Sequence, residues 1–437
     1  MARQSGSGHL FRALGLTFGI AVTVGGTIGV GILRAPGKVA AAAGSAWLTI
    51  GLWLLGGVYI MASALTIAEV AAMLPKAGGF YVYAREAFGD AVGFAAGWSD
   101  WLTQCASMAY LALSVGDFSI TLLGSRASPG WAPPIGAGAI VLLTLLQLRG
   151  LRASSRTQQV TSAVQAGGFL LLVAACFAWG GPRAAAIGVP VRGHWGVGVV
   201  LSMRAILGTY DGWYSAIYFA EEDRDPGRNI PRSMIGGVLA IVAVYILLNL
   251  AFLHVLGLPG MARSDFPASD AAQSIFGPRG SRVITILSLL SLPAVINAGL
   301  LCASRILFAM SRDGLFWRKG ADVNRRGTPA TSLLIGALAG IAMLFTGTFD
   351  ALLGVTGILT VLTYCCALVS LFVLRRTRPG LERPFRAPGY PWLPLAVIAG
   401  GFVFLVAAVG SDRTSTLIAF ALVGCSFPAY RLCKSSP

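Results

Sequence analysis

The feature that most constrains this chain is a series of long apolar stretches that follow one another from end to end. Of its 437 residues, 56% are hydrophobic and only 11% are charged, which is far too apolar for a soluble globular protein. A helix of about 20 apolar residues crosses the roughly 30 Å hydrocarbon core of a membrane. We therefore predict an all-α polytopic membrane protein with twelve transmembrane helices, at approximately residues 13–38, 46–74, 88–123, 135–150, 157–180, 195–222, 233–258, 281–311, 330–347, 350–374, 393–410 and 414–432.

The basic residues give the chain a formal net charge of +16, and their placement indicates its orientation. They lie in short loops between the apolar stretches and form no continuous patch, which argues against a nucleic-acid partner. With the N-terminus inside, twenty-three Lys and Arg residues fall on the cytoplasmic side and nine on the other, while Arg204 lies within a stretch. Because cytoplasmic loops carry the excess of positive charge, we predict a multi-pass protein of the cell (inner) membrane with both termini in the cytoplasm.

The first apolar stretch contains a glycine-rich segment from Gly25 to Leu33. Four of the seven residues from Gly25 to Gly31 are glycine, and each costs a helix roughly 1 kcal/mol relative to alanine. In lipid, a broken helix is tolerated only where the freed backbone groups face protein or a water-filled cavity. A break here implies a cavity that a substrate enters. The alternative is close helix packing, since Gly25 and Gly29 also have the spacing of small-residue packing motifs.

A second interrupted stretch lies about 180 residues further along the chain. The segment from Leu207 to Trp213 places glycine, an acid and aromatic residues inside an apolar span. Two interrupted spans at corresponding places in two halves are typical of the binding site of a secondary transporter built from inverted repeats. We predict a single transport domain over 1–437, with repeat one at about 13–180, an inverted repeat two at about 195–374 and two additional helices at about 393–432.

Several short motifs occur in order along the chain. They are Gly29-Val30-Gly31-Ile32-Leu33 with Pro36-Gly37, Ala68-Glu69 through Leu74-Pro75, Gly78-Gly79, Arg85-Glu86-Ala87-Phe88-Gly89, Leu148-Arg149-Gly150, Tyr210-Asp211-Gly212-Trp213 with Glu221-Glu222, and Ser311-Arg312-Asp313-Gly314. Together they resemble the signatures of the amino acid, polyamine and organocation (APC) transporter superfamily, and in particular its L-type and bacterial amino acid permeases. The resemblance implies a 5+5 inverted-repeat (LeuT-like) fold with helices 1 and 6 broken. It also implies a secondary active transporter or exchanger that moves amino acids by alternating access.

The resemblance and the chemistry of helix ends indicate the same substrate site, at the two breaks. A broken helix supplies N–H donors for a substrate carboxylate at the start of its second half, and carbonyl acceptors for an ammonium at the end of its first half. The candidate substrate-binding residues are Thr27, Ile28, Gly29, Val30 and Gly31 in the first break and Leu207, Gly208, Tyr210, Asp211 and Trp213 in the second. We expect the N–H groups of Gly29, Val30 and Gly31 to bind the carboxylate. We expect the carbonyls of Leu207, Gly208 and Tyr210 to bind the ammonium.

Two of these positions carry further expectations. L-type members of the superfamily commonly place a bulky aromatic gate where this chain has Gly208, so we expect a more open pocket. Asp211 has two alternative roles. It caps a half-helix that follows the break, as aspartate does well, or it acts on a substrate ammonium or a proton, because a carboxylate at membrane depth is by default a functional candidate.

Other ionisable residues in or near the apolar stretches are candidates for coupling or gating. These candidates are Glu69, Asp100, Arg204 and Glu221, together with the uncharged Gly168. Glu69 and Glu221 also have a purely structural alternative, which is pairing with Arg85, Arg224 or Arg305. Several sodium-independent members of the superfamily carry a lysine in the fifth span, and Gly168 stands at the matching position. We predict sodium independence and leave proton coupling, exchange and facilitated diffusion open.

The chain offers little that would support catalysis. Its three histidines and seven cysteines show no metal-ligand spacing, so we predict no catalytic residue, no metal and no cofactor. Two alternatives to amino acid transport stay open: a polyamine or organic cation substrate, and a transporter-like amino acid sensor. The expected partners are a small-molecule substrate (an amino acid or related amine) and the lipid bilayer, with protons as an open case.

Overall fold

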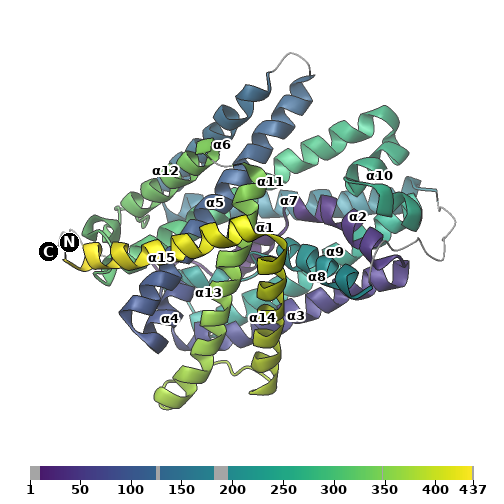
Figure 1. The fold of residues 1–437 in the computed structure, drawn as a ribbon. Coiled ribbons are helices and arrows are strands. Elements are labelled where there is room, and N and C mark those ends of the chain that lie inside the picture. The colour runs from purple at the N-terminus through teal and green to yellow at the C-terminus, as the bar shows by residue number, and fades with distance from the viewer. Residues whose placement is uncertain (1–9, 125–127, 182–194, 347, 436–437) are drawn as a thin grey trace.

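The computed structural model describes residues 10–124, 128–181, 195–346 and 348–435, and within these ranges it contains helices and no β-strand (Figure 1). The α-helices are α1 (Leu16–Thr27), α2 (Gly31–Ala43), α3 (Ala46–Met73), α4 (Phe80–Phe88), α5 (Asp90–Leu123), α6 (Ala132–Leu148), α7 (Leu151–Trp179), α8 (Trp195–Thr209), α9 (Pro226–Arg263), α10 (Pro267–Phe276), α11 (Gly280–Arg312), α12 (Ala330–Thr346), α13 (Phe349–Thr377), α14 (Trp392–Ser411) and α15 (Arg413–Ser435). The 3₁₀ helices are η2 (Pro129–Trp131), η3 (Ser215–Glu222), η4 (Gly277–Arg279) and η5 (Arg318–Ala321). Four of the basic residues used for the predicted orientation, Arg3, Arg126, Arg183 and Arg192, lie outside the described residues.

The helix lengths establish a multi-pass membrane protein. Seven described helices are long and apolar enough to cross a membrane, and α1 with α2 adds an eighth if the bent pair is one span. Four further apolar helices are shorter: Ala132–Leu148, Gly198–Thr209, Ala330–Thr346 and Trp392–Ala407. The predicted stretches 46–74 and 330–347 correspond closely to α3 and α12. Hydrophobic length alone therefore located most helices to within a few residues.

The first stretch ends later than its predicted limit at residue 38. Helix α2 contains Pro36 and continues to Ala43. It stops at Gly44, whose φ of 67° is left-handed and whose N–H bonds to the carbonyl of Ala40. Glycine adopts this conformation without steric cost, which makes it a common helix terminator.

Two short helices, α4 and α10, precede the long helices α5 and α11 and were not predicted from the sequence. Each ends at a Phe-Gly pair, and the two glycines, Gly89 and Gly277, have φ angles of 88° and 61°. In Figure 1, α4 lies at the left of the molecule with the C-terminal end of α15, whereas α10 lies at the right. Similar helices therefore occupy opposite ends of the protein.

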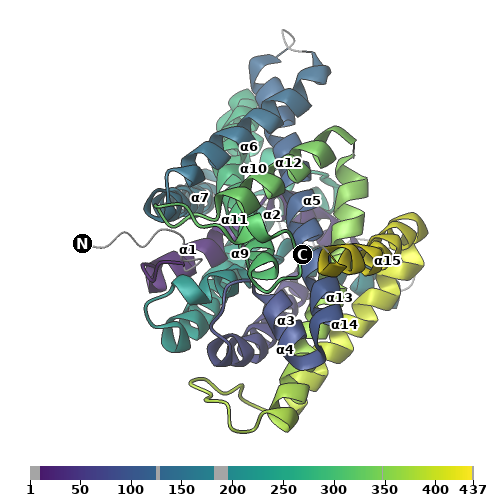
Figure 2. The same cartoon turned by 90° about the vertical axis from the view of Figure 1, so that its left-hand side faces the viewer.

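The centre of the molecule is formed by α1, α5, α7, α9 and α11: α11 packs against α1, α5 and α7, and α9 packs against α1 and α7. Helices α13, α14 and α15 lie on the side away from α7 (Figure 2). The entry to the first span is tied to the end of η3, because the N–H groups of Ala13 and Leu14 donate to the carbonyl of Glu222 at 2.9 and 3.0 Å. Residues far apart in the sequence thus meet beside α1.

A buried ion pair holds η3 against α11. Arg305 Nη2 lies 2.9 Å from Glu222 Oε1, and the two side chains are 1% and 0% exposed. Removing one partner of a buried pair leaves a charge without compensation, at a cost of about 3–5 kcal/mol. We therefore expect Glu222→Gln to lower the thermal denaturation temperature in detergent markedly. Glu86→Gln, which breaks two pairs with the exposed Lys76 and Arg378, is the control and should change it less. Equal temperatures for the two variants would contradict the stabilising role of the buried pair.

Candidate functional site

Helices α1 and α2 meet at the first glycine-rich segment, where the sequence predicts a break. Helix α1 ends at Thr27, α2 begins at Gly31, and the two are bent by 53°. Between them Ile28 is extended, with φ −73° and ψ 101°. Among the described residues, no hydrogen bond uses the backbone N–H of Gly29, Val30 or Gly31. These donors at the start of α2 are therefore available to an anion.

Helix α8 ends at the second segment, but the structure that follows it differs from the predicted half-helix. Helix α8 ends at Thr209, and the chain turns through Gly212, whose φ is 103°. The expected second half-helix is instead the 3₁₀ helix η3, which has no side-chain cap. A capping role for Asp211 is therefore not supported. Ser215 Oγ donates to the Gly212 carbonyl at 2.7 Å and stabilises the turn.

The two breaks lie directly against each other. A Cβ on Gly212 would come within 2.3 Å of the Gly26 carbonyl oxygen, and a Cβ on Gly31 would lie 3.2 Å from Thr209 Oγ1. Glycine at 212 is thus required both by the positive φ and by the close approach of backbone. The predicted residues of the first break and those at the end of α8 are brought together.

Two residues that sequence reasoning missed hold the carbonyls at these breaks. The Tyr245 hydroxyl of α9 lies 2.9 Å from the Thr209 carbonyl and 3.2 Å from the Thr27 carbonyl. The Gln165 amide of α7 donates to the Ile28 carbonyl and, at 3.3 Å, to the Ser291 carbonyl of α11. Tyr245 and Gln165 are both fully buried. The only signal for them in the sequence was a polar side chain within an apolar helix.

Gly168, the predicted coupling position in the fifth span, does not reach the break. A Cβ there would lie 2.4 Å from Leu287 Cδ1, so the residue serves close packing of α7 against α11. The contact between α7 and the first break is made by Gln165, nearly one helical turn earlier. A residue longer than glycine at 168 would have to displace Leu287.

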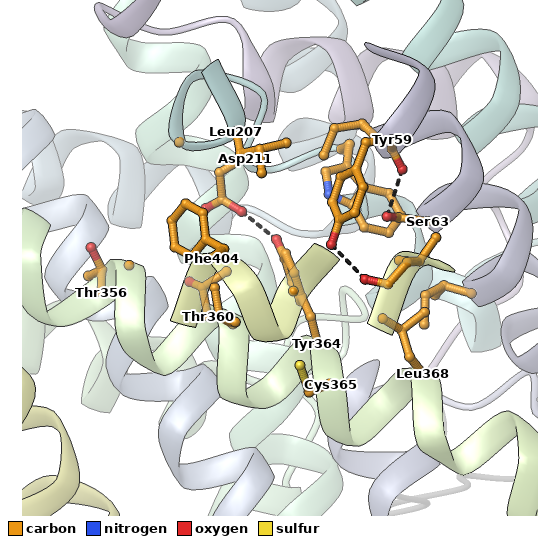
Figure 3. Close-up of a pocket in the computed structure, with 18 of the residues that line it drawn as sticks. Tyr59, Ser63, Leu207, Asp211, Thr356, Thr360, Tyr364, Cys365, Leu368 and Phe404 are labelled. Carbon is orange, nitrogen blue, oxygen red and sulfur yellow. Dashed lines mark hydrogen bonds between the residues drawn. The ribbon is translucent and has the colours of Figure 1, made fainter. Parts of the chain in front are cut away.

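A cavity of about 100 Å³ opens beside the second break, between α3, α8, α13 and α14 (Figure 3). A water molecule needs roughly 10–15 Å³ of such space, so the cavity has room for several waters or a small side chain. Of the predicted residues, four line it: Leu207, Gly208, Asp211 and Trp213. The first-break residues Thr27, Ile28, Gly29, Val30 and Gly31 do not line it, and neither does Tyr210. The predicted site is thus divided between the junction of the breaks and this cavity.

The cavity is open where α8 has no side chain and polar where the break begins. A Cβ on Gly208 would meet nothing within 4 Å, in agreement with the more open pocket expected there. Asp211 accepts a hydrogen bond from the hydroxyl of Tyr364 on α13, and Figure 3 shows these two side chains pointing toward each other. Tyr210 points elsewhere, with its hydroxyl 3.4 Å from the Trp53 carbonyl.

Asp211→Asn separates a functional carboxylate from a structural one. Asparagine keeps an oxygen that can accept from Tyr364 but cannot hold negative charge, and a hydrogen bond to a charged group contributes about 1.5–3 kcal/mol. We expect the variant to weaken substrate binding about 10-fold or more and to alter the pH dependence of transport. Native affinity together with native pH dependence, measured in proteoliposomes, would show that Asp211 has only a structural role.

The deeper charged candidates do not pair with each other. Asp100 is buried and accepts hydrogen bonds from the Tyr218 hydroxyl at 2.8 and 2.9 Å. Arg204 instead interacts with Asp412, between α14 and α15. The pKa of Asp412 lies below its ordinary value, chiefly because the backbone and side chain of Ser415 hydrogen-bond to it, and Arg204 adds to this effect.

Glu69 and Glu221 are held in ion pairs, but not with the arginines considered from the sequence. Glu69 is fully buried and lies 2.6 Å from Arg375 Nη2 and 3.6 Å from Arg383 Nε. Glu221 lies 2.7 Å from Arg312 Nη1 and accepts a hydrogen bond from the Ala77 N–H at 3.0 Å. These contacts favour the structural alternative for both acids.

Comparison with known proteins places this geometry in a family. The model of the amino acid permease family matches residues 10–427. The chain belongs to this family. It is 28% identical to the serine/threonine exchanger SteT of Bacillus subtilis over 432 residues, covering 96% of each chain. It is 29% identical to the b(0,+)-type amino acid transporter 1 of Rattus norvegicus, covering 91% of this chain and 82% of that protein.

A third relative supports the same assignment. The large neutral amino acids transporter small subunit 2 of Mus musculus is 27% identical over 453 residues, covering 98% of this chain and 82% of that protein. These relatives thus match most of the length of the chain. The permease is a transport protein of the APC superfamily and not an enzyme, as the sequence motifs predict.

Proposed function

We propose that this permease exchanges amino acids across the cell membrane by alternating access, with the substrate held where the two breaks meet. The observation that carries the proposal is the junction itself. The N–H groups of Gly29, Val30 and Gly31, which have no partner among the described residues, begin α2 directly beside the end of α8 at Thr209. A helix N-terminus attracts a carboxylate and a helix C-terminus attracts an ammonium, which is the charge pattern of an amino acid.

The cavity of Figure 3 is proposed to receive part of the substrate side chain. It begins at Gly208 and Asp211 of the second break and is lined mostly by apolar residues of α3, α13 and α14. In such a site, backbone groups bind the carboxylate and ammonium that all amino acids share. The neighbouring side chains then determine which substrate side chain fits. The cavity lining contains the acid Asp211. A carboxylate there could also bind a cationic group, which is why the alternative of a polyamine or organic cation substrate is tested as well.

The arrangement of spans supports an inverted-repeat transporter. We propose that the seven long helices, the bent pair and the four shorter apolar helices are the twelve spans. We propose that α1 to α7 and α8 to α13 form repeats of opposite orientation, since α4 and α10 lie at opposite ends of the molecule (Figure 1). Both termini are then cytoplasmic, as the distribution of Lys and Arg predicts.

Counterflow in proteoliposomes tests the proposal. Vesicles containing the purified protein are loaded with one unlabelled compound at a time from a panel of amino acids and polyamines, and uptake of a labelled amino acid or polyamine is followed. We expect uptake that saturates, is competed by unlabelled substrate and depends on an amino acid inside. Binding in a thermal-shift screen without flux in either direction would indicate a sensor. Flux restricted to polyamines would indicate the organic cation alternative.

Sodium independence is the expected result of replacing sodium with choline or potassium in this assay. The carbonyls of Ile28 and Ser291, which lie near each other at the first break, are both hydrogen-bonded by the Gln165 amide. An amide donor in this position competes with a cation for the same oxygens. A strict requirement for sodium would contradict the prediction, and Ser288 and Ser291 of α11 would then be the first ligands to test.

A further inference from the structure

A separate groove of about 860 Å³ lies where α3 ends and α9 begins. Its walls come from the end of α3, the first turns of α9 and the loop between α13 and α14, and it shares no lining residue with the cavity of Figure 3. Both α3 and α9 are candidate membrane spans, Ala46–Met73 and Pro226–Arg263. The groove thus lies at the ends of two candidate membrane spans, where a lipid headgroup is one class of ligand to consider.

The loop wall of the groove is fixed by a buried acid. Glu69 of α3 pairs with Arg375 and Arg383 and also accepts the Ala387 N–H at 2.7 Å. On the other side, a Cβ on Gly227 of α9 would lie 3.0 Å from Pro384 Cβ, so α9 and the loop are in close contact there. The groove is thus bounded by elements that are held in place, and it exists before anything binds.

The groove is lined by basic and acidic side chains that form no ion pair with other described residues. Arg228 and Arg232 are exposed, lie one turn apart on α9 and line the same groove as Asp225 and Glu382. Within the described part of the chain, no ion pair joins any of these four residues to another charged group. A ligand with one anionic and one cationic group would satisfy both kinds of charge.

The remaining lining is apolar. Met73, Ile235, Leu381 and Phe385 face the groove between the charged residues. A soluble zwitterion would not use these side chains, whereas the glycerol and first methylene groups of a lipid would contact them. The charges, the apolar lining and the position at the end of two spans are therefore complementary to a phospholipid headgroup.

We propose that this groove binds the headgroup of a phosphoethanolamine lipid from the adjoining leaflet. Arg228 and Arg232 bind the phosphate, since guanidinium groups pair well with phosphate oxygens. Glu382, with Asp225, binds the ammonium. Basic pockets at the ends of membrane helices are suited to lipid headgroups, and the additional acid gives selectivity for a headgroup that carries an amine. This assignment does not depend on which amino acid the permease carries.

Native mass spectrometry of the full-length, delipidated protein tests the proposal. The protein is titrated with phosphatidylethanolamine or with phosphatidylglycerol of the same acyl chains, and bound molecules are counted. We expect one phosphatidylethanolamine to be retained at least about 5-fold better than phosphatidylglycerol. Arg228→Gln/Arg232→Gln should remove this preferred molecule. The matched control is Arg152→Gln/Arg156→Gln, a pair of exposed arginines with the same spacing on α7, and it should retain it.

Two further measurements identify the groups and the source of the ligand. Glu382→Gln should abolish the preference for phosphatidylethanolamine over phosphatidylglycerol while leaving phosphate binding intact. Arg228→Lys/Arg232→Lys, which keeps the charge, should restore most of the binding and shows that a loss in the glutamine variant is not misfolding. Equal retention of both lipids by the wild type, or an equal loss in the α7 control, would overturn the proposal. So would displacement of the lipid by soluble glycerophosphoethanolamine at equal concentration, because the groove would then recognise a free metabolite.

Discussion

Replacing Gly29 or Gly31 with leucine is expected to abolish amino acid binding and transport while leaving the protein folded. The side chain would occupy the space in front of the N–H groups that begin α2. A hydrogen bond to a charged group contributes about 1.5–3 kcal/mol, so the loss of two or three such bonds to a carboxylate removes measurable binding. At Gly29 the nearest atom to an added Cβ is Val295 Cγ2 at 3.9 Å, so the first atom of the new side chain fits.

Uptake in proteoliposomes and ligand-induced thermal stabilisation measure this effect. Gly167→Leu is a suitable control, because a Cβ at Gly167 of α7 meets nothing within 4 Å and the residue belongs to neither break. Gly31→Leu is expected to be the less stable of the two variants, since Thr209 lies only 3.2 Å from its Cβ position. Native affinity in both leucine variants would show that the substrate binds elsewhere. Failure of both to fold, with a folded control, would favour helix packing as the role of these glycines.

Tyr245→Phe is expected to slow transport about 10-fold or more without preventing folding. The hydroxyl of Tyr245 is within hydrogen-bonding distance of the Thr209 and Thr27 carbonyls, one at the end of each broken helix. Without it, a buried acceptor loses its partner, at a cost of about 1–3 kcal/mol, or roughly 5- to 150-fold. The position of the two breaks relative to each other should then be less well defined. The carbonyl groups proposed to accept from the substrate ammonium should be less well positioned as a result.

Tyr210→Phe provides the matched control for this experiment. The Tyr210 ring packs beside that of Tyr245, with centroids 4.9 Å apart, but its hydroxyl makes only a 3.4 Å contact with the Trp53 carbonyl. Loss of so long a hydrogen bond should have little effect. Wild-type transport rates in both phenylalanine variants would contradict a special role for Tyr245. The same reduced rate in both variants would indicate a general effect of removing a buried hydroxyl.

The sequence was sufficient to predict most of the long helices, because apolar length depends on local composition. Apolar length located helices such as α3 and α12, and clustered glycine located the end of α1 at Thr27. The second interruption was found for the same reason, since Gly208 and Gly212 lie close together in an apolar stretch. The type of helix after it was not predicted: η3 is a 3₁₀ helix that packs against α1, α9 and α11, which lie far away in the sequence or on either side of it.

The partners of the break residues could not be predicted, because they come from distant parts of the chain. Gln165 and Ile28 are 137 residues apart, and Tyr364 and Asp211 are 153 apart. Sequence reasoning considered Arg85, Arg224 and Arg305 as partners for Glu69 and Glu221, and the buried Asp100 is bound by the uncharged Tyr218. In a chain with many buried tyrosines and amides, opposite charge alone does not identify a partner.

A structure of the permease with a transported amino acid bound would show directly whether the substrate carboxylate lies at the start of α2. The measured quantity is the distance from the substrate carboxylate oxygens to the backbone nitrogens of Gly29, Val30 and Gly31. We predict at least two such distances of about 3 Å, with the ammonium near the carbonyls at the end of α8 and the side chain directed toward Gly208. A substrate bound with its carboxylate away from α2, for example wholly within the cavity between α3, α13 and α14, would contradict the account.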